Sequence, residues 1–333
     1  MNGTRQPQQR VDGVLLLDKP QGITSNDALL RVRRLLNARK AGHGGTLDPM
    51  ASGLLPIALG EATKFANDSL DADKAYLAEI AMGVVTTTGD AEGEVVSTRP
   101  VALDAATLAA ALAAFVGEID QVPPMHSALK RDGRPLYEYA RAGITLEREP
   151  RRVTIHSLDL LSFGPVPDAR AGAPGAWRAL VRVACSKGTY VRTLAEDVGE
   201  RLGCGAHLSG LRRERVGALT VERAHTLERL EAMSAAERAA CLEPADFMLA
   251  ALPALELDEA HARRFLHGQR LRLAPAAGLA ARGSTRVRVY RHGCLLGTGS
   301  LDDGLLVPQR LVGNPTSEPR HEPAAVSPSE SAT

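Results

Sequence analysis

The spacing of apolar and polar residues predicts a chain that mixes strands and helices over its first 250 residues. Short apolar runs bounded by turn residues are typical of buried strands, and Ala- and Leu-rich segments that end at glycine are typical of helices. The predicted strands are 13–18, 76–83, 153–163, 176–184 and 216–221, with a shorter apolar element at 207–211. The predicted helices are 24–36, 49–60, 103–115, 191–202 and 226–241.

The pattern changes near Pro253, where the predicted elements become shorter. A helix at 260–266 and strands at 271–273, 286–290 and 294–300 indicate a small β-rich domain, 251–313. A domain of about 60 residues is near the lower limit of independent stability. The polar lead 1–10 and the Pro-, Ser- and Glu-rich tail 314–333 are expected to be disordered.

The segment 120–144, DQVPPMHSALKRDGRPLYEYARAGI, has few positions that could form a core. It combines prolines, two tyrosines and several cations with a Gly-containing turn and a short predicted helix. We therefore expect it to be an insertion on the surface.

The net charge of the chain indicates little about its partners, but the distribution of its cations indicates more. The net charge is only +1 over 333 residues. The cations nevertheless gather in four clusters, namely Arg31/Arg33/Arg34/Arg39/Lys40, Lys130/Arg131/Arg134/Arg141, Arg148/Arg151/Arg152 and Arg212/Arg213/Arg215. These clusters could assemble a surface that attracts phosphates, or they could be ordinary solvated faces of helices.

Several classes of protein are disfavoured by what the sequence lacks. Its four cysteines are far apart and form no CxxC pair, so we expect no metal site and no disulfide framework, which fits a reducing cytoplasm. We expect no signal peptide and no membrane helix, since the polar N-terminal residues precede no long apolar run. The dinucleotide, P-loop, zinc-protease and esterase motifs GxGxxG, GxxxxGK[ST], HExxH and GxSxG are also missing.

The stretch from Lys40 to Phe65, KAGHGGTLDPMASGLLPIALGEATKF, places one carboxylate in a glycine-containing loop. Gly44 and Gly45 allow close approach of the backbone, and Pro49 suits the first turn of a helix. Asp48 before that proline is typical of a helix N-cap. From these residues alone, capping is the more common role and catalysis the less common one.

This stretch closely resembles the catalytic motif of the TruB family of pseudouridine synthases, the bacterial tRNA pseudouridine-55 synthases. Three further segments resemble the family in the same order: GVLLLDKPQGITS near the start, Lys74-Ala75-Tyr76, and CSKGTYVRTLAEDVGERLGCGAHLSGLRR at 185–213. The segment at about 120–150 is similar to the family's tRNA-binding insertion. The resemblance spans roughly 11–250, and more loosely the region to 313.

The resemblance implies a fold, an activity and a partner. The fold would be α+β, with a mixed, mostly antiparallel sheet and flanking helices at 11–250, followed by a small PUA-like RNA-binding domain. The activity would be that of an isomerase, an intramolecular transferase that flips the T-loop uridine of tRNA and converts it to pseudouridine. The resemblance implies that the reaction needs no cofactor and no metal. It also implies that tRNA is the partner, and we expect a monomer in the cytoplasm.

The resemblance also assigns catalytic roles to residues that could otherwise have ordinary structural roles. Asp48 would be the catalytic carboxylate, acting as a nucleophile or as a ribose-stabilising base. Tyr76 would lie on the flipped uracil and is a candidate for the later proton transfer, although alone it would be a core tyrosine of a strand. Arg192 would pair with Asp48 and keep it ionised; otherwise it would be an ordinary surface arginine of a helix.

The remaining matched positions concern the uracil pocket and the RNA. Positions matched to the pocket or the flipped nucleotide are His43, Tyr190 and Leu211, which without the resemblance would be structural. Cations expected to contact the RNA are Lys19, Lys64, Lys130 and Lys187. Lys64 could equally be a cation at the C-terminus of a helix.

Two departures and two alternatives accompany this interpretation. Gly44 stands where many family members have threonine, and His126 where many have tyrosine, which affects fine contacts only. A non-catalytic tRNA-binding or tRNA-folding protein could keep the same fold, but it would not need Asp48, Tyr76 and Arg192 together. A nucleotide-binding metabolic enzyme would need a phosphate loop, which the sequence does not contain.

Overall fold

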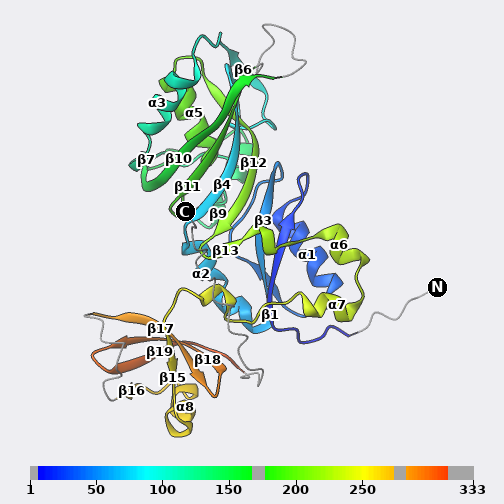
Figure 1. Ribbon diagram of the computed structural model, residues 1–333, viewed down its shortest axis with the longest axis vertical. Coiled ribbons are helices and arrows are strands. Elements are labelled where there is room, and N and C mark those ends of the chain that lie inside the picture. Colours follow the sequence, from blue (N-terminus) through cyan, green and yellow to red (C-terminus); the bar gives the residue numbers. More distant parts are fainter. Residues whose placement is uncertain (1–6, 167–176, 274–282, 314–333) are drawn as a thin grey trace, which may run out of the picture.

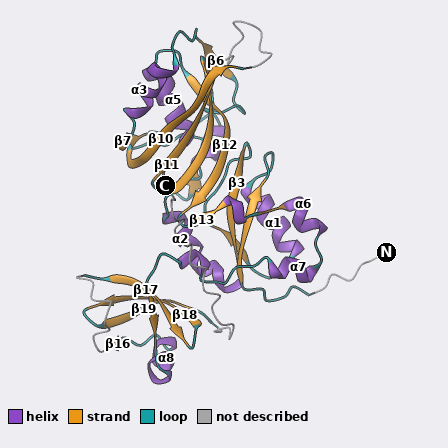
Figure 2. Ribbon diagram, in the orientation of Figure 1, coloured by secondary structure: helices purple, strands orange, loops and turns teal. Residues whose placement is uncertain are grey.

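The computed structural model describes residues 7–166, 177–273 and 283–313. They form a large ten-stranded sheet and a separate five-stranded sheet, together with two short hairpins. The small sheet lies at one end of an elongated molecule, and helices cover two separate parts of the large sheet (Figures 1 and 2). Within the described ranges, no helix is long and apolar enough to cross a membrane.

The large sheet is mixed and mostly antiparallel, as predicted. Only the pairs β1–β14 and β3–β12 are parallel within it. In spatial order its strands are β14 (His225–Thr226), β1 (Gly13–Lys19), β3 (Ala51–Leu59), β12 (Ala206–Val216), β4 (Lys74–Met82), β11 (Trp177–Cys185), β10 (Arg151–Pro165) and β7 (Gly117–Gln121). Two short strands, β2 (Ala41–His43) and β13 (Leu219–Thr220), pair with β3 and β12.

Two groups of helices bury the large sheet. The first is α1 (Ser25–Leu35), α6 (Leu227–Ala232) and α7 (Ala235–Ala240), of which α1 and α6 pack on β1 and β3. The second is α3 (Ala105–Ala113) and α5 (Val191–Arg201), which pack on β4, β10, β11 and β12. Figure 1 shows the two groups well apart along the sheet. Each group builds its own apolar cluster, and the middle of the sheet lies between the two clusters.

The predicted helix at 49–60 is wrong, because this segment is strand β3. The strand lies between β1 and β12, and eight of its nine residues are buried. A strand buried on both faces is an unbroken apolar run, which periodicity cannot distinguish from a buried helix. Asp48 therefore precedes a turn and a strand, and it does not cap a helix.

Two other predicted boundaries differ from the structure. The element predicted at 207–211 extends to Val216 as one long strand, β12, whose register shifts at two points let it bend along β4. The strand predicted at 216–221 is divided: it supplies the last residue of β12, a turn and the short strand β13, which pairs back on β12. The predicted helix at 226–241 divides into α6 and α7. The division falls at Ser234, which caps α7 in a reciprocal arrangement with Glu237.

The segment 120–150 lies at the edge of the large sheet and is mostly exposed. It follows the edge strand β7 and contains a hairpin and a short helix, namely β8 (Lys130–Arg131), β9 (Arg134–Pro135) and α4 (Leu136–Arg141). Nearby, strands β5 (Val84–Thr86) and β6 (Val95–Thr98) form the second hairpin. Residues 167–176, between β10 and β11, lie outside the described residues.

The small sheet contains two strands that the sequence did not predict. Its order is β15 (Ala254–Glu256), β17 (Thr285–Arg291), β18 (Cys294–Asp302), β19 (Leu305–Leu311) and β16 (Leu271–Arg272), and β15 and β19 are the unpredicted ones. Helix α8 (Glu259–Leu266) packs Ala262 and Phe265 into its core. The predicted tail 314–333 and the lead residues 1–6 lie outside the described residues.

The small domain is fixed to a segment that follows β3. That segment is the 3-10 helix η1 (Gly60–Phe65) continued by α2 (Ala66–Asp71). Arg286 of β17 forms an ion pair with Asp68, and Lys64 donates to the Leu311 carbonyl at 2.8 Å. The apolar contact at this junction is made by Phe65, Leu249 and Val312.

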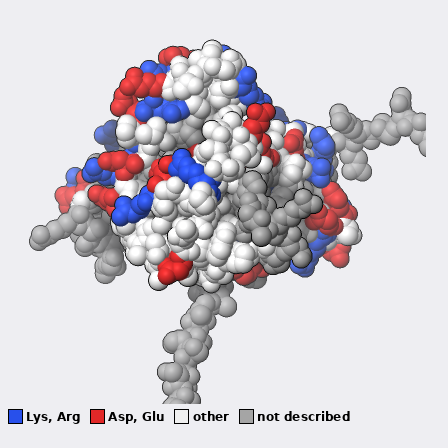
Figure 3. Space-filling model, turned by 90° about the horizontal axis from the view of Figure 1, so that it is seen from above, with Lys and Arg blue, Asp and Glu red and all other residues white. Residues whose placement is uncertain are grey.

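Charged side chains are interspersed on the surface. On the face shown in Figure 3, patches of Lys and Arg lie beside patches of Asp and Glu, with uncharged residues between them. The fourth predicted cationic cluster does not form a phosphate-binding patch, because Arg213 is 1% exposed and Arg212 pairs with Asp18 through two hydrogen bonds of 2.9 and 2.7 Å.

Candidate active site

Asp48 lies in the loop between β2 and β3, at the middle of the large sheet. The Ala51 N–H donates to the Asp48 carbonyl at 3.0 Å and closes a turn just before β3. Ser25, the first residue of α1, fixes the loop on the other side, because its hydroxyl accepts from the Leu47 N–H at 2.8 Å and donates to the Leu47 carbonyl at 2.9 Å. The Asp48 backbone is thus held by the sheet on one side and by a buried serine on the other.

The two glycines of the loop allow close contact with protein. A Cβ on Gly44 would lie 2.4 Å from the Cβ of Ser69 in α2, so only glycine fits. Gly45 has φ of +102°, and its carbonyl accepts from Arg213 at 3.1 Å. These glycines therefore serve the packing of the loop on α2 and β12.

Arg192 connects the Asp48 carboxylate to a second carboxylate. Its Nη2 lies 3.1 Å from Asp48 Oδ2, and its Nη1 lies 3.3 Å from Asp90 Oδ2. The same guanidinium donates to the Thr88 carbonyl at 3.2 Å and the His126 carbonyl at 2.7 Å. Arg192 is the second residue of α5, and its side chain is 7% exposed. It is therefore fixed from several directions and presents one edge to Asp48.

Asp90 was not among the candidate residues that the sequence indicated. The structure buries Asp90 to 3% exposure and gives it two local donors, the Thr88 hydroxyl at 2.5 Å and the Glu92 N–H at 3.1 Å. A buried carboxylate requires such donors and a cationic partner. Asp90 accordingly fixes the far side of the Arg192 guanidinium.

The surroundings of Asp48 alter its basicity. Burial raises the pKa of the Asp48 carboxyl, the nearby Arg192 guanidinium opposes that rise, and Asp90 adds to it. Lys19 at the end of β1 is fully buried, and its ammonium donates to the carbonyls of Pro20 and Ile23 at 2.9 and 2.8 Å. Burial lowers the pKa of Lys19 to about 8, although the nearby Asp48 carboxylate opposes the shift.

Tyr76 and Leu211 occupy the middle of the sheet beside this carboxylate. Both are partly buried, and both pack against the apolar clusters of the two helix groups. Tyr76 on β4 pairs in register with Arg213 on β12. Burial raises the pKa of the Tyr76 phenol, and the Arg213 guanidinium limits the rise. Tyr76 is therefore a neutral phenol with an apolar neighbour and a buried cation.

Arg213 fixes the loop that carries Asp48. Its Nε donates to the Leu54 carbonyl at 2.8 Å and its Nη2 to the Gly45 carbonyl, with a longer contact of 3.5 Å from Nη1 to the Thr46 carbonyl. No carboxylate pairs with it in the part of the chain that the structure describes. In the sequence, Arg213 belongs to a cationic cluster expected on the surface, and nothing local indicates its contacts with the loop.

His43 and Tyr190 flank the same region from different elements. His43 ends β2; burial lowers the pKa of its imidazole, which favours the neutral form, and the Nδ1 atom is buried with no hydrogen-bond partner among the described residues. Tyr190 precedes α5, and its backbone exchanges two hydrogen bonds with the Gln121 side-chain amide, at 3.0 and 3.3 Å. Burial raises the pKa of the Tyr190 phenol.

Three of the predicted RNA-contacting lysines lie away from this cluster. Lys64 donates to Glu61 and to the Leu311 carbonyl, both at 2.8 Å, so it serves the junction with the small domain. Lys187 is 61% exposed and pairs with Asp71 at 2.8 Å. Lys130 is exposed in the β8–β9 hairpin. Lys19 is the one predicted lysine next to Asp48.

The described residues hold no group of three or more His, Cys, Asp or Glu side chains arranged to bind a metal ion. The site consists instead of one partly exposed carboxylate beside a buried arginine, with a tyrosine, a leucine and a histidine nearby. Such a set can stabilise or attack an electron-poor carbon and can hold a planar ring.

Three family models match the chain. The model described as TruB family pseudouridylate synthase, N-terminal domain, matches residues 33–191. The tRNA pseudouridylate synthase B C-terminal domain matches 192–250. A third model, pseudouridine synthase II TruB, C-terminal, matches 253–312.

Curated relatives and solved structures are similar to the chain over most of its length. It is 58% identical over 308 residues to tRNA pseudouridine synthase B of Burkholderia lata, covering 92% of each chain. It is 57% identical over 313 residues to the protein of that name from Ralstonia nicotianae, covering 92% of this chain and 96% of the relative.

Among solved structures, a chain in the crystal structure of the archaeal box H/ACA sRNP Nop10-Cbf5 complex matches with a TM-score of 0.66 at 24% identity, covering 94% of this chain and 88% of that one. A chain in the structure of an H/ACA RNP bound to a substrate RNA containing 2'-deoxyuridine matches with a TM-score of 0.64 at 24% identity, covering 93% and 92%. These two likenesses concern the fold.

Proposed function

This chain belongs to the TruB family of pseudouridylate synthases, and we propose that it isomerises a uridine of tRNA to pseudouridine with Asp48 as the catalytic carboxylate. The observation that carries the proposal is the ion pair of Asp48 with Arg192, in which a partly exposed carboxylate faces a buried guanidinium. The aromatic and apolar side chains beside it, Tyr76 and Leu211, suit a planar base.

The reaction breaks the bond between N1 of uracil and C1′ of its ribose, turns the base, and joins C5 to C1′. The proton on C5 leaves, and N1 regains one, so the product is an isomer of the substrate. As the first bond breaks, C1′ becomes electron-poor, and a carboxylate there either forms a covalent adduct or stabilises the developing charge. Both roles require Asp48 to be ionised and aimed at the ribose.

The surroundings of Asp48 suit that requirement. The pKa raised by burial makes this carboxylate more basic than an ordinary aspartate, while Arg192 limits the rise and fixes its direction. Asp90 in turn keeps Arg192 in place from the other side. Lys19 adds a second nearby cation. A preorganised carboxylate of this kind needs no rearrangement when the charge develops.

The target base must leave its stack before Asp48 can reach C1′. Flipping costs a few kcal/mol, and stacking on an aromatic ring returns roughly 1–3 kcal/mol per base. We assign this stacking to Tyr76, with Leu211 and Tyr190 as further walls of the uracil pocket. His43, held neutral by its surroundings, is placed to contact the flipped nucleotide without adding a charge. Tyr76 is also the candidate for removing the C5 proton.

The RNA partner follows from the same family membership. We propose the T-arm of tRNA as the substrate, gripped by the insertion at 120–150 with Lys130 among its cations, and by the small domain at 251–313. Lys187 is an additional candidate contact, whereas the contacts of Lys64 favour a role at the domain junction. A monomer without metal or small-molecule cofactor, acting where tRNA is found in the cytoplasm, completes the proposal.

Nothing in the site favours the alternative of a non-catalytic tRNA-binding protein. Such a protein could bind through the insertion and the small domain alone. It would not require Asp48 beside a buried Arg192 or a partly buried Tyr76 near Asp48.

The test is tritium release from T-arm RNA labelled at C5 of uridine, in buffer with EDTA. We expect release by the wild-type protein, none by Asp48→Asn, and equal tRNA affinity for both. The control is Asp73→Asn, an exposed aspartate whose carboxylate contacts His156, which should react like the wild type. No release by the wild-type protein would refute the enzymatic proposal, and release by Asp48→Asn would refute the role of this residue. Mapping the modified position in full-length tRNA tests the choice of the T-loop.

A further inference from the structure

Helix α2 lies between the large sheet and the small domain (Figure 1). It has only six residues, Ala66–Asp71, and no side chain caps its N-terminal end. A helix of this length is not stable alone in water, so its position depends on the elements that contact it. Those contacts come from the small domain, from the large sheet and from the loop that carries Asp48.

The small domain holds α2 through a charged pair. Asp68, in the first turn of the helix, accepts from both Nη atoms of Arg286 on β17, one at each carboxylate oxygen. The Asp68 side chain is 14% exposed. A two-point pair with a largely buried carboxylate holds its partners more firmly than an exposed ion pair does. Directly before α2, Phe65 packs on Val312 at the end of the small domain.

The large sheet holds the other end of α2 through Lys74, the first residue of β4. Its ammonium donates to the carbonyls of Leu70 and Ala72 at 2.6 and 2.5 Å, and the residue is 7% exposed. Lys74 is two residues before Tyr76, so the two side chains leave the same face of the strand. One end of α2 is therefore attached to the strand that carries Tyr76, and the other end to the small domain.

The loop that carries Asp48 packs against the middle of α2. A Cβ on Gly44 would overlap the Cβ of Ser69, and one on Gly45 would lie 3.8 Å from the Leu70 side chain. Ser69 is 3% exposed and directly follows Asp68. A backbone packed this closely on a helix moves with it, because protein interiors leave little free space. Consecutive residues of α2 thus contact the small domain and the Asp48 loop.

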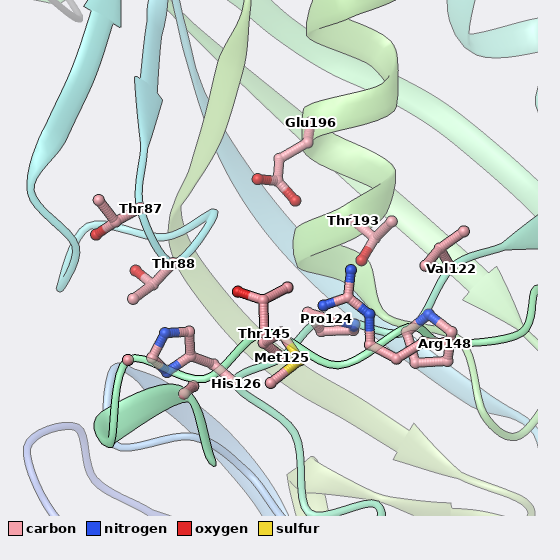
Figure 4. Close-up of a pocket in the computed structure, with 13 residues that line it drawn as sticks. Thr87, Thr88, Val122, Pro124, Met125, His126, Thr145, Arg148, Thr193 and Glu196 are labelled. Atoms are coloured by element: carbon pink, nitrogen blue, oxygen red, sulfur yellow. The ribbon is translucent and has the colours of Figure 1, made fainter. Parts of the chain in front are cut away.

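The second support of the Asp48 carboxylate does not involve the small domain. Arg192 is fixed by the carbonyls of Thr88 and His126, and both residues line a cavity of about 460 Å³ (Figure 4). The residues described around this cavity all belong to 87–196. Within the part of the chain that the structure describes, α2 is therefore the element that contacts both the small domain and the Asp48 loop.

We propose that α2 couples the placement of the small domain to the position of the Asp48 loop, with Asp68 as a positioning residue. The pair of Asp68 with Arg286 holds α2 in place, and the contact of Ser69 with Gly44 then fixes the loop in the position that aims Asp48 at the ribose. The small domain contributes in this way to the rate of the reaction and not only to RNA binding. This inference rests on the proposed function, because the rate concerned is that of the isomerisation.

The test compares two carboxylates that hold the same strand of the small domain. Asp68→Asn removes the link through α2. The control, Asp246→Asn, removes a link outside α2, because Asp246 contacts Arg288 at 3.7 Å and accepts from the Tyr290 hydroxyl, both on β17. The two carboxylates are similarly buried, with side chains 14% and 17% exposed. Arg286→Gln removes the first link from the side of the small domain and should reproduce the effect of Asp68→Asn.

Four measurements are made on the full chain. Single-turnover tritium release gives the rate, titration with tRNA gives the affinity, thermal unfolding shows that the variants are folded, and hydrogen exchange of the peptide 43–50 reports on the loop. We expect Asp68→Asn to lower the rate about tenfold, within the range of coupling between packed elements, and to speed exchange of the loop. Asp246→Asn should leave both unchanged, and any loss in tRNA affinity should be equal in the two variants.

The double variant Asp68→Asn with Ser69→Gly tests the path through α2. If Asp68 acts through the contact of Ser69 with Gly44, the rate of the double variant should be no lower than that of the slower single variant. Losses that multiply would overturn the proposal, as would equal rates for Asp68→Asn and Asp246→Asn. An inactive wild type would refute the proposed function instead, and exchange of the peptide 43–50 would then decide the coupling, since it requires no reaction.

Discussion

Arg192 and Asp48 form an ion pair with very unequal exposure, because the arginine side chain is 7% exposed and the aspartate side chain 39%. The cation is fixed in the protein while the carboxylate remains open to a substrate. This asymmetry suits a reaction in which the carboxylate must meet a carbon atom of the substrate. If Asp48 acts as proposed, we expect the position of Arg192, and of the groups that hold it, to affect the reaction rate.

We expect Asp90→Asn to lower kcat by about 10- to 100-fold with little change in KM. The amide keeps the shape of the side chain but removes the charge that fixes Arg192, and charge-assisted hydrogen bonds contribute roughly 1.5–3 kcal/mol. Because Asp90 raises the pKa of Asp48, the acidic limb of the kcat profile should also move to lower pH. Single-turnover tritium release at several pH values measures both effects.

The matched control for this prediction is Asp159→Asn, an exposed aspartate on β10. A loss in kcat without any movement of the acidic limb would contradict the effect assigned to Asp90 on the pKa of Asp48. A Tm far below that of the control would mean that the loss in kcat arises from folding.

We expect the reaction rate to fall at alkaline pH, because Lys19 then loses its charge. Its pKa is lowered to about 8 by burial, so the cation beside Asp48 is lost as the pH rises above that value. We expect kcat/KM to fall between about pH 8 and pH 9 in the wild type. In Lys19→Arg, whose guanidinium stays charged, the rate should be lower overall but flat over that range. A wild-type profile flat to pH 9 would exclude a role for this charge.

Stability should change in the opposite direction to activity. The lowered pKa of Lys19 means that the folded state binds fewer protons than the unfolded state between about 8 and the ordinary value of 10.5. The free energy of unfolding contributed by this group therefore rises with pH across that window. Urea unfolding should show the wild type gaining stability relative to Lys19→Met as the pH increases from 8 to 10.

The sequence predicted the parts of this molecule that local rules determine. The helix at 103–115 follows its Ala- and Leu-rich composition, both this helix and the one at 191–202 end close to a glycine, and strand β11 follows alternation. Strand β3 was missed because it is buried on both faces, which removes the alternation that identifies a strand.

The sequence predicted some residues of the site and not others, because local patterns do not show contacts between distant parts of the chain. The positions of Asp48, Tyr76 and Arg192 were suggested by motifs, whereas Asp90 and Arg213 gave no local signal. Asp90 lies in a turn typical of any loop, and its importance depends on Arg192, which is 102 residues further along the chain. Arg213 was grouped with surface cations, because the sequence of β12 alone does not show that its side chain is buried. In the structure it contacts the loop that carries Asp48.

Arg213→Lys should slow the reaction about tenfold or more. A lysine keeps the charge, but its single ammonium cannot span the Gly45 and Leu54 carbonyls that the planar guanidinium joins. The loop that carries Asp48 should then lose its fixed position, and its amides should exchange hydrogen faster. Tritium release and hydrogen exchange of the peptide 43–50 measure the two effects.

Arg215→Lys provides the comparison, because Arg215 is the neighbouring half-buried arginine and bonds to the Gly217 carbonyl. It should leave both the rate and the exchange of the loop unchanged. Equal behaviour of the two variants would contradict the role assigned to Arg213.

Gly44→Thr should destabilise this protein. Its Cβ would lie 2.4 Å from the Ser69 Cβ, and overpacking of this kind costs about 1–3 kcal/mol. A loss of that size should lower Tm by several degrees. Adding Ser69→Gly removes the opposing atom and should restore most of the lost stability, which would demonstrate direct coupling of the two positions.

The control for this pair is Gly42→Ala in β2, where the nearest atom to an added Cβ is 3.9 Å away. It should leave Tm close to that of the wild type. If Gly44→Thr were as stable as Gly42→Ala, the close contact between the loop and α2 would not hold in solution. If Ser69→Gly failed to rescue it, the cost would arise elsewhere. Rescue of both Tm and tritium release would instead show that packing on α2 sets the position of the loop that carries Asp48.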